Sequence, residues 1–313
     1  MRLQALHHIT MITGDARQNA DYYADVLGLR MVKKTVNFDQ PEAYHLYFGD
    51  EQGAPGSILT WFEFPGAARG RAGAGMIHLI QLGVGSEDSL DFWAQRLRSR
   101  GYQATRASSS LRFEDYDGLA FELAPDDGGN PPLRAAHPEI PAEHAITGVQ
   151  GARAYVPASA VAAENPLLTQ TLGFAHRGEG VYRLDGDHRH VNWAYDSAPD
   201  PVGIQGAGTV HHIAWACVDA DQRDWQRRVR EAGHHVTEVL DRDYFTSIYF
   251  REPRGILFEI ATLSPGFAVD EDPDHLGEQL RLPRQHQHLR EQLEKRLTPV
   301  ENPRVARRQS VGT

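Results

Sequence analysis

The sequence predicts an α+β fold in which four βαβββ modules pair into two barrels of curved sheet. A β-prone run followed by an amphipathic helix recurs four times, and each helix is followed by a glycine: Gly28, Gly101, Gly173 and Gly233. The tails GLAFELA, at residues 118–124, and GILFEIA, at residues 255–261, also resemble each other. A half-built curved sheet leaves unpaired edges, so we expect each module to pair with another.

The first module sets the pattern. Its run LHHITMI at residues 6–12 is β-prone, and apolar residues between Ala20 and Leu27 recur at helical spacing before Gly28 ends the helix. The segments LRMVKKTVNF, YHLYFGD and GSILTWFEF follow, with the composition of strands. The module is therefore a strand, a helix and about three further strands.

The other three modules open in the same way. Their strand and helix segments are MIHLIQLGV with SEDSLDFWAQRLRSRG, ITGVQGARAYV with PASAVAAENPLLTQTLG, and TVHHIAWACV with DADQRDWQRRVREAG. A stretch rich in proline and glycine at residues 125–141 is typical of a linker. We therefore expect one domain of two modules at residues 1–136, a second at 137–265, and a helical tail at 266–313.

Composition excludes several classes of protein. The 313 residues are 41% hydrophobic and 24% charged, which is typical of an ordinary folded protein. A formal charge of -10 argues against a nucleic-acid or anionic-membrane partner. The single cysteine excludes an intrachain disulfide, no run is long enough to span a membrane, and the start lacks the layout of a signal peptide. We expect a cytoplasmic protein whose oligomeric state the sequence leaves open.

Two histidine pairs stand at matched places in the repeat. His7 and His8 lie in the first strand of the first module, and His211 and His212 lie in the first strand of the fourth. Two matched pairs favour metal binding over a structural role for each histidine. Because side chains alternate across a strand, one member of each pair faces the interior, and the residues alone leave open which one.

Glu259 adds a carboxylate from the last strand of the fourth module, between Phe258 and Ile260. A carboxylate in an apolar strand is costly unless a cation or metal pairs it. Together with one histidine from each pair, it would form the 2-His-1-carboxylate triad of non-haem Fe(II) oxygenases, which leaves metal positions open. The second module offers only His78 and Glu122, which we interpret as relics or paired core residues.

A closed site with four protein ligands is the main competing interpretation. The position in the first module that matches Glu259 is Thr60, a poor metal ligand, and Glu63 should face the opposite side of its strand unless a bulge intervenes. A fourth ligand would suit a glyoxalase-like isomerase or lyase that uses Zn²⁺ or Ni²⁺. A third interpretation is a metal-free protein that binds or sequesters a small aromatic molecule.

Several segments of the sequence resemble those of a known family. The segments LHHIT, YHLYFGDEQGAPGSILTWF, VHHIA and RGILFEIAT resemble the hydroquinone-type ring-cleaving dioxygenases of the vicinal oxygen chelate, or glyoxalase and bleomycin resistance, superfamily. The resemblance covers most of the chain and implies the vicinal oxygen chelate fold. It also implies that His8, His212 and Glu259 hold Fe(II), with Mn²⁺ or Zn²⁺ as alternatives.

The resemblance further implies residues around a substrate pocket. Arg242, Tyr249 and His211 match catalytic positions, and His7 and Thr10 match substrate-binding positions. Strand alternation agrees for Thr10, which should share the face of His8, but it predicts that His7 and His211 point away from the metal.

The function implied by this resemblance is that of a non-haem iron, extradiol-type dioxygenase. Such an enzyme inserts both atoms of O₂ into a dihydroxylated aromatic ring, so its partners are a small aromatic substrate and oxygen. Catechol-cleaving relatives carry all three ligands in the second half of the chain, whereas here His8 lies in the first half. This distribution favours a hydroquinone-like ring over catechol.

Overall fold

Two eight-stranded curved sheets of mixed direction form the protein, described here from a computed structural model of residues 1–199 and 202–311. Each module has the predicted order of a strand, a helical segment and three strands. The four glycines that follow the module helices all have a positive φ, between 71° and 88°, as expected for residues that end a helix. The predicted fold class is therefore confirmed.

The first sheet is built from the first and fourth modules, in the order β14-β15-β16-β13-β1-β4-β3-β2. Its strands are β1 (Leu6–Thr13), β2 (Arg30–Val36), β3 (Tyr44–Gly49), β4 (Ile58–Glu63), β13 (Thr209–Cys217), β14 (Leu240–Asp241), β15 (Thr246–Arg251) and β16 (Leu257–Thr262).

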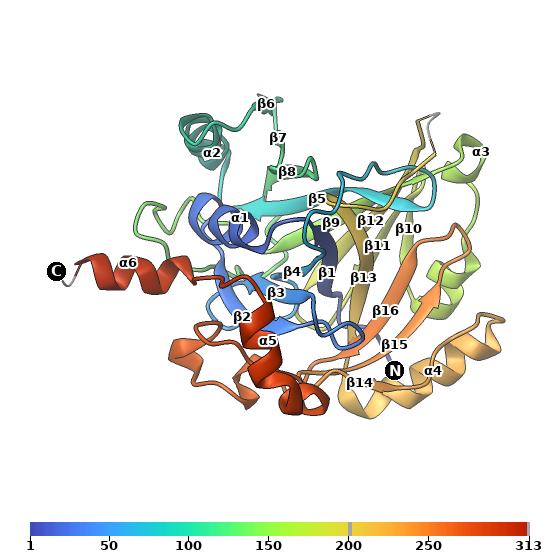
Figure 1. The fold of residues 1–313 in the computed structure, drawn as a ribbon. Helices are drawn as coiled ribbons and strands as arrows, with labels where there is room; N and C mark the ends of the chain where they lie inside the picture. The colour runs from blue at the N-terminus through green and yellow to red at the C-terminus, as the bar shows by residue number, and fades with distance from the viewer. Residues whose placement is uncertain (200–201, 312–313) are drawn as a thin grey trace.

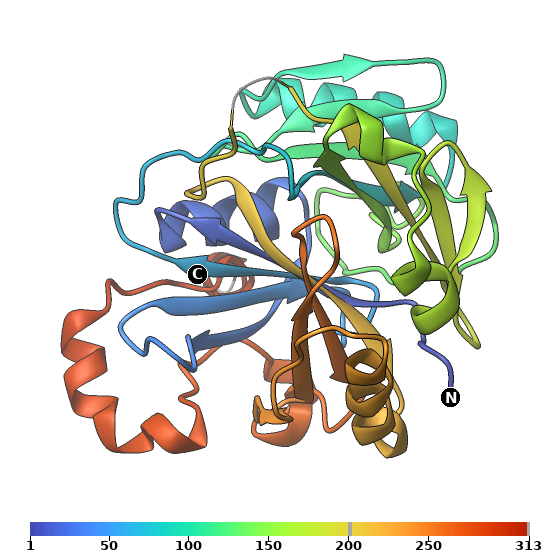
Figure 2. The ribbon, with the colours of Figure 1, turned by 90° about the vertical axis from the view of Figure 1, so that its right-hand side faces the viewer.

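The second sheet is built from the second and third modules, in the order β10-β11-β12-β9-β5-β8-β7-β6. Its strands are β5 (Met76–Val84), β6 (Ala104–Arg106), β7 (Leu111–Glu114), β8 (Ala120–Pro125), β9 (Val149–Val156), β10 (Ala175–Gly178), β11 (Val181–Asp185) and β12 (His190–Ser197). Figures 1 and 2 show the two sheets as separate lobes, with the first and last modules together in one of them.

This pairing crosses the division of the chain that we expected at residue 136. Each module exposes its first strand at an edge, and that edge is covered by antiparallel pairing of β1 with β13 and of β5 with β9. Neither pair joins neighbours within 1–136 or within 137–265. The first and fourth modules therefore share one sheet, although the second and third modules separate them in the sequence.

Helical segments cover the sheets. Asp15 caps the first of them by accepting hydrogen bonds from the backbone N–H groups of Arg17 and Gln18. The segments in the modules are α1 (Ala16–Asp21) continued by η1 (Tyr22–Val26), α2 (Glu87–Ser99), α3 (Ala158–Val161) with η2 (Leu167–Leu172), and η3 (Asp219–Asp221) with α4 (Gln222–Glu231). None of the described helices is both long enough and apolar enough to cross a lipid bilayer.

The tail after β16 wraps along β2, the edge strand of the first sheet. Lys33 of β2 is completely buried and forms ion pairs with Asp270, at 2.6 Å, and with Glu271. Lys34 forms a parallel bridge with Leu280 of the tail. The tail carries η4 (Phe267–Val269), η5 (Pro273–His275), η6 (Arg284–Leu289), α5 (Arg290–Arg296) and α6 (Pro303–Val311). It thereby covers an edge that would otherwise be open to another chain.

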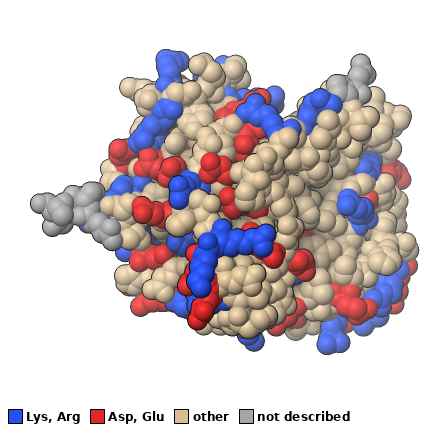
Figure 3. All heavy atoms as spheres, viewed as in Figure 1, with Lys and Arg blue, Asp and Glu red and all other residues tan. Residues whose placement is uncertain are grey.

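Acidic and basic side chains are interspersed over the face of the molecule seen in Figure 3. On the described part of this face, the structure does not present the continuous basic patch that is typical of nucleic-acid binding.

Candidate metal centre

Three neighbouring strands of the first sheet bring His8, His212 and Glu259 together. His8 comes from β1, His212 from β13 and Glu259 from β16. The Nε2 atoms of the two histidines are 3.3 Å apart, and they lie 3.3 Å (His8) and 2.9 Å (His212) from Glu259 Oε2. Among the described residues, these three form the group of His, Cys, Asp and Glu side chains that could hold a metal ion.

The carboxylate is buried and ionised. Glu259 is completely buried, and its Oε1 accepts a hydrogen bond from Ser247. Its Oε2 finds no hydrogen bond of acceptable geometry within the described residues. Burial alone would raise the pKa of Glu259, but His8 and His212 hold it well below the usual range. One oxygen of a buried anion therefore faces two imidazoles.

Each candidate ligand histidine is contacted from behind by the preceding histidine. His7 Nδ1 lies 2.8 Å from His8 Nδ1, and His211 Nδ1 lies 2.7 Å from His212 Nδ1. Burial, together with the adjacent imidazole, lowers the pKa of His7 to about 3, so its ring is neutral and can accept a hydrogen bond. The pKa of His211 is lowered as well, although this residue is more exposed than His7. With a metal on the two Nε2 atoms, the remaining protons of His8 and His212 would sit on Nδ1 and point at His7 and His211.

The donor set fits a divalent metal. With protons on Nδ1, the two Nε2 atoms and Glu259 Oε2 are three acceptors that face one another. Ligand atoms at right angles and about 2.1 Å from one metal ion are about 3.0 Å apart, close to the observed spacing. Because three mutually facing acceptors repel one another, a cation between them would stabilise this arrangement.

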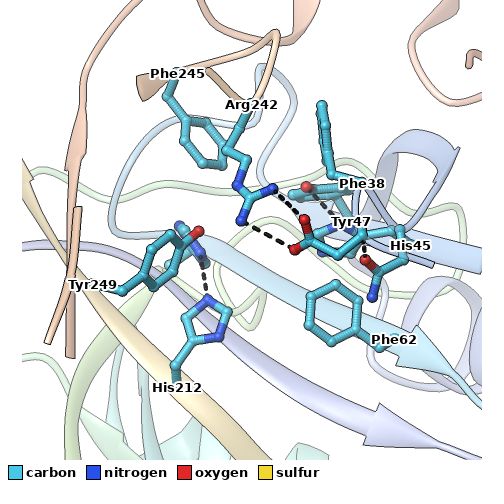
Figure 4. Close-up of a pocket in the computed structure, with 11 residues that line it drawn as sticks. Phe38, His45, Tyr47, Phe62, His212, Arg242, Phe245 and Tyr249 are labelled. Carbon is cyan, nitrogen blue, oxygen red and sulfur yellow. Dashed lines mark hydrogen bonds and ion pairs between the residues drawn. The ribbon is translucent and has the colours of Figure 1, made fainter. Parts of the chain in front are cut away.

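A small cavity adjoins these histidines. Figure 4 shows Arg242 and Phe245 reaching toward it from one side, with Phe62 and His212 on the opposite side. Its volume is about 30 Å³. The lining residues are His8, Asn37, Phe38, Asp39, His45, Tyr47, Phe62, His212, Arg242, Phe245 and Tyr249.

The residues implied by the family resemblance divide into two groups. Arg242 and Tyr249 line the cavity, and the Arg242 guanidinium lies 5.5 Å from the centre of the Tyr249 ring. Burial and the nearby Glu259 raise the pKa of Tyr249, so its phenol stays protonated. His7, His211 and Thr10 do not line this cavity. His7 and His211 instead lie behind the candidate ligands, and Thr10 lies 3.5 Å from the hydroxyl of Thr60.

His45 was not singled out from the sequence. Its Nε2 contacts the hydroxyl of Thr60, and its Nδ1 lies 2.9 Å from the hydroxyl of Tyr47. Burial, with His8 and His212 adding to the effect, keeps the pKa of His45 well below the usual range. The alternation of His45 and Tyr47 on β3 could have revealed a polar face, because both lie in the segment YHLYFGD.

The position of Glu63 bears on the closed four-ligand site. Its carboxylate accepts a hydrogen bond from the backbone N–H of Ala16 at 3.1 Å, at the start of α1. The predicted orientation of Glu63, opposite to Thr60, is therefore confirmed. Glu63 does not add a fourth ligand to His8, His212 and Glu259.

The second sheet carries paired charges where the first carries the candidate ligands. His78 contacts Asp196 at 2.8 Å, and Glu122 accepts hydrogen bonds from Arg112 at 2.6 Å and Gln81 at 2.8 Å. The interpretation of His78 and Glu122 as paired residues is therefore confirmed.

The curved sheets of βαβββ modules and the cluster of two histidines and a glutamate are features by which a protein superfamily can be recognised. Comparison with known families identifies that superfamily. Residues 5–123 and 167–260 match the Glyoxalase/Bleomycin resistance protein/Dioxygenase superfamily. The chain belongs to this superfamily, as its motifs predicted.

Individual relatives extend over nearly the whole chain. The chain is 42% identical to the "Putative ring-cleaving dioxygenase MhqO" of Bacillus subtilis (strain 168), over 96% of this chain and 97% of the relative. It is 30% identical to the "Chlorohydroquinone/hydroquinone 1,2-dioxygenase" of Sphingobium indicum (strain UT26S), over 93% and 95%.

Solved structures agree with this assignment. A crystal structure of a "putative dioxygenase" from Bacillus subtilis superposes with a TM-score of 0.87 at 39% identity, over 96% of this chain and 98% of that one. Glyoxalase I from Zea mays superposes with a TM-score of 0.56 at 15% identity, over 82% and 92%, and so shares the fold alone.

Proposed function

We propose that this protein is a metal-dependent ring-cleaving dioxygenase that acts on a dihydroxylated aromatic ring of the hydroquinone type. The observation that carries the proposal is the meeting of His8 Nε2, His212 Nε2 and Glu259 Oε2 beside a cavity lined by aromatic side chains. The names of the relatives with 42% and 30% identity support the same reaction class.

His8, His212 and Glu259 would hold the metal, with Fe(II) as the proposed ion and Mn²⁺ or Zn²⁺ as alternatives. When bound, Fe(II) would lower the pKa of a coordinated phenol and supply the redox chemistry of O₂ activation. Three protein ligands would leave part of the ion's coordination free for ligands from outside the protein, such as a substrate oxygen. The orientation of Glu63 toward Ala16 supports this open site over a closed one.

The surrounding residues have separable roles. His7 and His211 orient the ligand imidazoles by accepting the Nδ1 protons of His8 and His212. Arg242 offers a positive charge to a substrate oxygen that becomes negative during the reaction. Tyr249 keeps its proton and can donate a hydrogen bond to the same region.

The test is anaerobic purification followed by metal analysis and by oxygen uptake with hydroquinone and with catechol. We expect near-stoichiometric iron and oxygen uptake that disappears in Glu259→Ala. Glu122→Ala is the matched control, because Glu122 has the same place in the second sheet but is paired with Arg112. A protein that consumes no oxygen after reconstitution with Fe(II) would contradict the proposal.

A further inference from the structure

A bidentate ion pair forms part of the wall of the cavity. Arg242 Nη1 lies 3.3 Å from Asp39 Oδ1, and Arg242 Nη2 lies 3.2 Å from Asp39 Oδ2. Asp39 follows β2 of the first module, whereas Arg242 follows β14 of the fourth module. The pair therefore joins the two modules across the site, as Figure 4 shows by the dashed lines at the Arg242 guanidinium.

The cavity in this structure is too small for an aromatic ring. Its volume is about 30 Å³, whereas a protein cavity that binds benzene measures about 150 Å³. A space of this size holds about two water molecules at about 10–15 Å³ each. Some of the lining side chains must move before a ring can enter.

Asp39 is the lining group best placed to move. Its side chain is 78% exposed, against 15% for Arg242, whereas His45 and Tyr47 are buried in β3. The backbone beside it is held in place, because the carbonyl oxygen of Phe38 accepts hydrogen bonds from Gln285 at 2.6 Å and His286 at 2.8 Å. Opening therefore requires rotation of side chains rather than movement of the loop.

Asp39 also sets the charge of this part of the cavity wall. Its carboxylate occupies both guanidinium nitrogens with which Arg242 could bind a carboxylate on a ligand. With Asp39 in place, Arg242 is neutralised, and an anionic ring gains little by reaching it. The neighbouring Glu42 does not share this position, because it pairs with Arg296 of the tail at 3.6 Å.

We propose that Asp39 is a specificity-determining residue: its ion pair with Arg242 closes the cavity and makes the site favour uncharged dihydroxylated rings over rings that carry a carboxylate. This proposal rests on the proposed function for the identity of the ring. Asp39 would then act as a gate that its salt bridge with Arg242 holds shut. A ligand that enters the cavity would break this salt bridge.

The first test measures binding by calorimetry, without oxygen, to Zn²⁺-loaded wild type, Asp39→Asn, Asp39→Glu and the control Glu42→Gln. The probes are hydroquinone and 2,5-dihydroxybenzoate. Because an exposed ion pair is weak, Asp39→Asn should bind hydroquinone about two- to fivefold more tightly. The ratio of the two affinities should shift about tenfold toward the carboxylated ring. Asp39→Glu and Glu42→Gln should both retain the preference of wild type.

The second test needs neither metal nor catalysis. Metal-free protein is treated with diethyl pyrocarbonate, and modification of His45 is followed by mass spectrometry. Asp39→Asn should be modified about two- to fivefold faster than wild type, and added salt should speed the wild type but not this variant. Equal rates in wild type, Asp39→Asn and Glu42→Gln would overturn the gate. Faster labelling in a protein that cleaves no ring would overturn only the proposed function.

Discussion

Glu259 of β16 and Glu122 of β8 occupy matching positions in two related strands, yet they meet opposite kinds of partner. Glu259 lies beside two imidazoles, with Nε2 of His212 at 2.9 Å, whereas Glu122 accepts hydrogen bonds from Arg112 and Gln81. The strand sequences FEIA and FELA barely differ. The neighbouring strands therefore decide whether the carboxylate meets two imidazoles or an arginine and an amide.

This contrast predicts a difference in metal affinity between two matched variants. Glu259→Gln removes the only anion of the candidate triad and should weaken binding of Co²⁺ or Fe(II) by at least about 100-fold. Glu122→Gln should bind as tightly as wild type. Titration against a chelating dye measures both, and equal losses in the two variants would contradict the assignment of the site.

The histidines behind the ligands should matter without touching the metal. His211→Ala removes the acceptor of the His212 Nδ1 proton, and we expect a loss of about 10–100-fold in metal affinity. His235→Ala is the control, because His235 is exposed on the same module. Titration against a chelating dye measures the metal affinity of both variants. An unchanged affinity in His211→Ala would show that His211 does not orient His212.

The ion pairs between Lys33 of β2 and the tail should contribute strongly to the free energy of unfolding. Lys33→Met leaves Glu271 buried without its closest cation, and breaking such a buried pair costs about 3–5 kcal/mol. Lys295→Met, at an exposed position of α5, should cost less than about 0.5 kcal/mol. Urea unfolding at neutral pH compares the two, and a cost below 1 kcal/mol for Lys33→Met would contradict the prediction.

The raised pKa of Asp115 should make the free energy of unfolding depend on pH. Burial raises its pKa from 3.8 to about 6, although Tyr23 donates a hydrogen bond to it at 2.6 Å. The folded protein holds this proton more tightly than the unfolded chain, so its stabilisation is complete below about pH 4 and is lost as pH rises through about 6. Compared with Asp115→Asn, wild type should lose about 2 kcal/mol between pH 4 and pH 7.

The measurement is urea unfolding of wild type and Asp115→Asn at several pH values in this range. Asparagine keeps Oδ1, which can still accept the bond from the backbone N–H of Leu119, and its NH₂ group replaces Oδ2 and can donate to the Tyr23 hydroxyl, so the variant is a close match in shape. If the stabilities of the two proteins run parallel from pH 4 to pH 7, Asp115 does not titrate as described.

Local patterns made much of the fold predictable from the sequence. The helix before Gly28 and the strands after it follow from periodicity and from a residue that tolerates positive φ, and these signals act over a few residues. The repeat places both histidine pairs and Glu259 at matched strand positions, and the family resemblance then selects His8 and His212 from the pairs. Their convergence in one sheet follows from the pairing of β1 with β13 and of β13 with β16.

Contacts between distant strands were harder to predict. Which modules pair depends on how whole strand edges fit together, and no local sequence signal reports that fit. The linker-like composition of residues 125–141 suggested a domain boundary there, but each sheet contains strands from both sides of it. The register of β1 against β13 shifts on both sides of the segment from His8 to Thr10, which disturbs simple alternation around His7. His45 lies on β3 and lines the cavity because β3 pairs with β4, and no local sequence signal specifies this pairing.

Pairing of the outer modules has a consequence for synthesis of the chain. His8 leaves the ribosome early, but Glu259 follows 251 residues later, which takes roughly 10–50 s at ordinary rates of translation. The second sheet, whose last strand ends at Ser197, is complete well before β13 and β16 emerge. A nascent chain therefore holds no finished triad, and His8, His212 and Glu259 can come together only after the last module has been made.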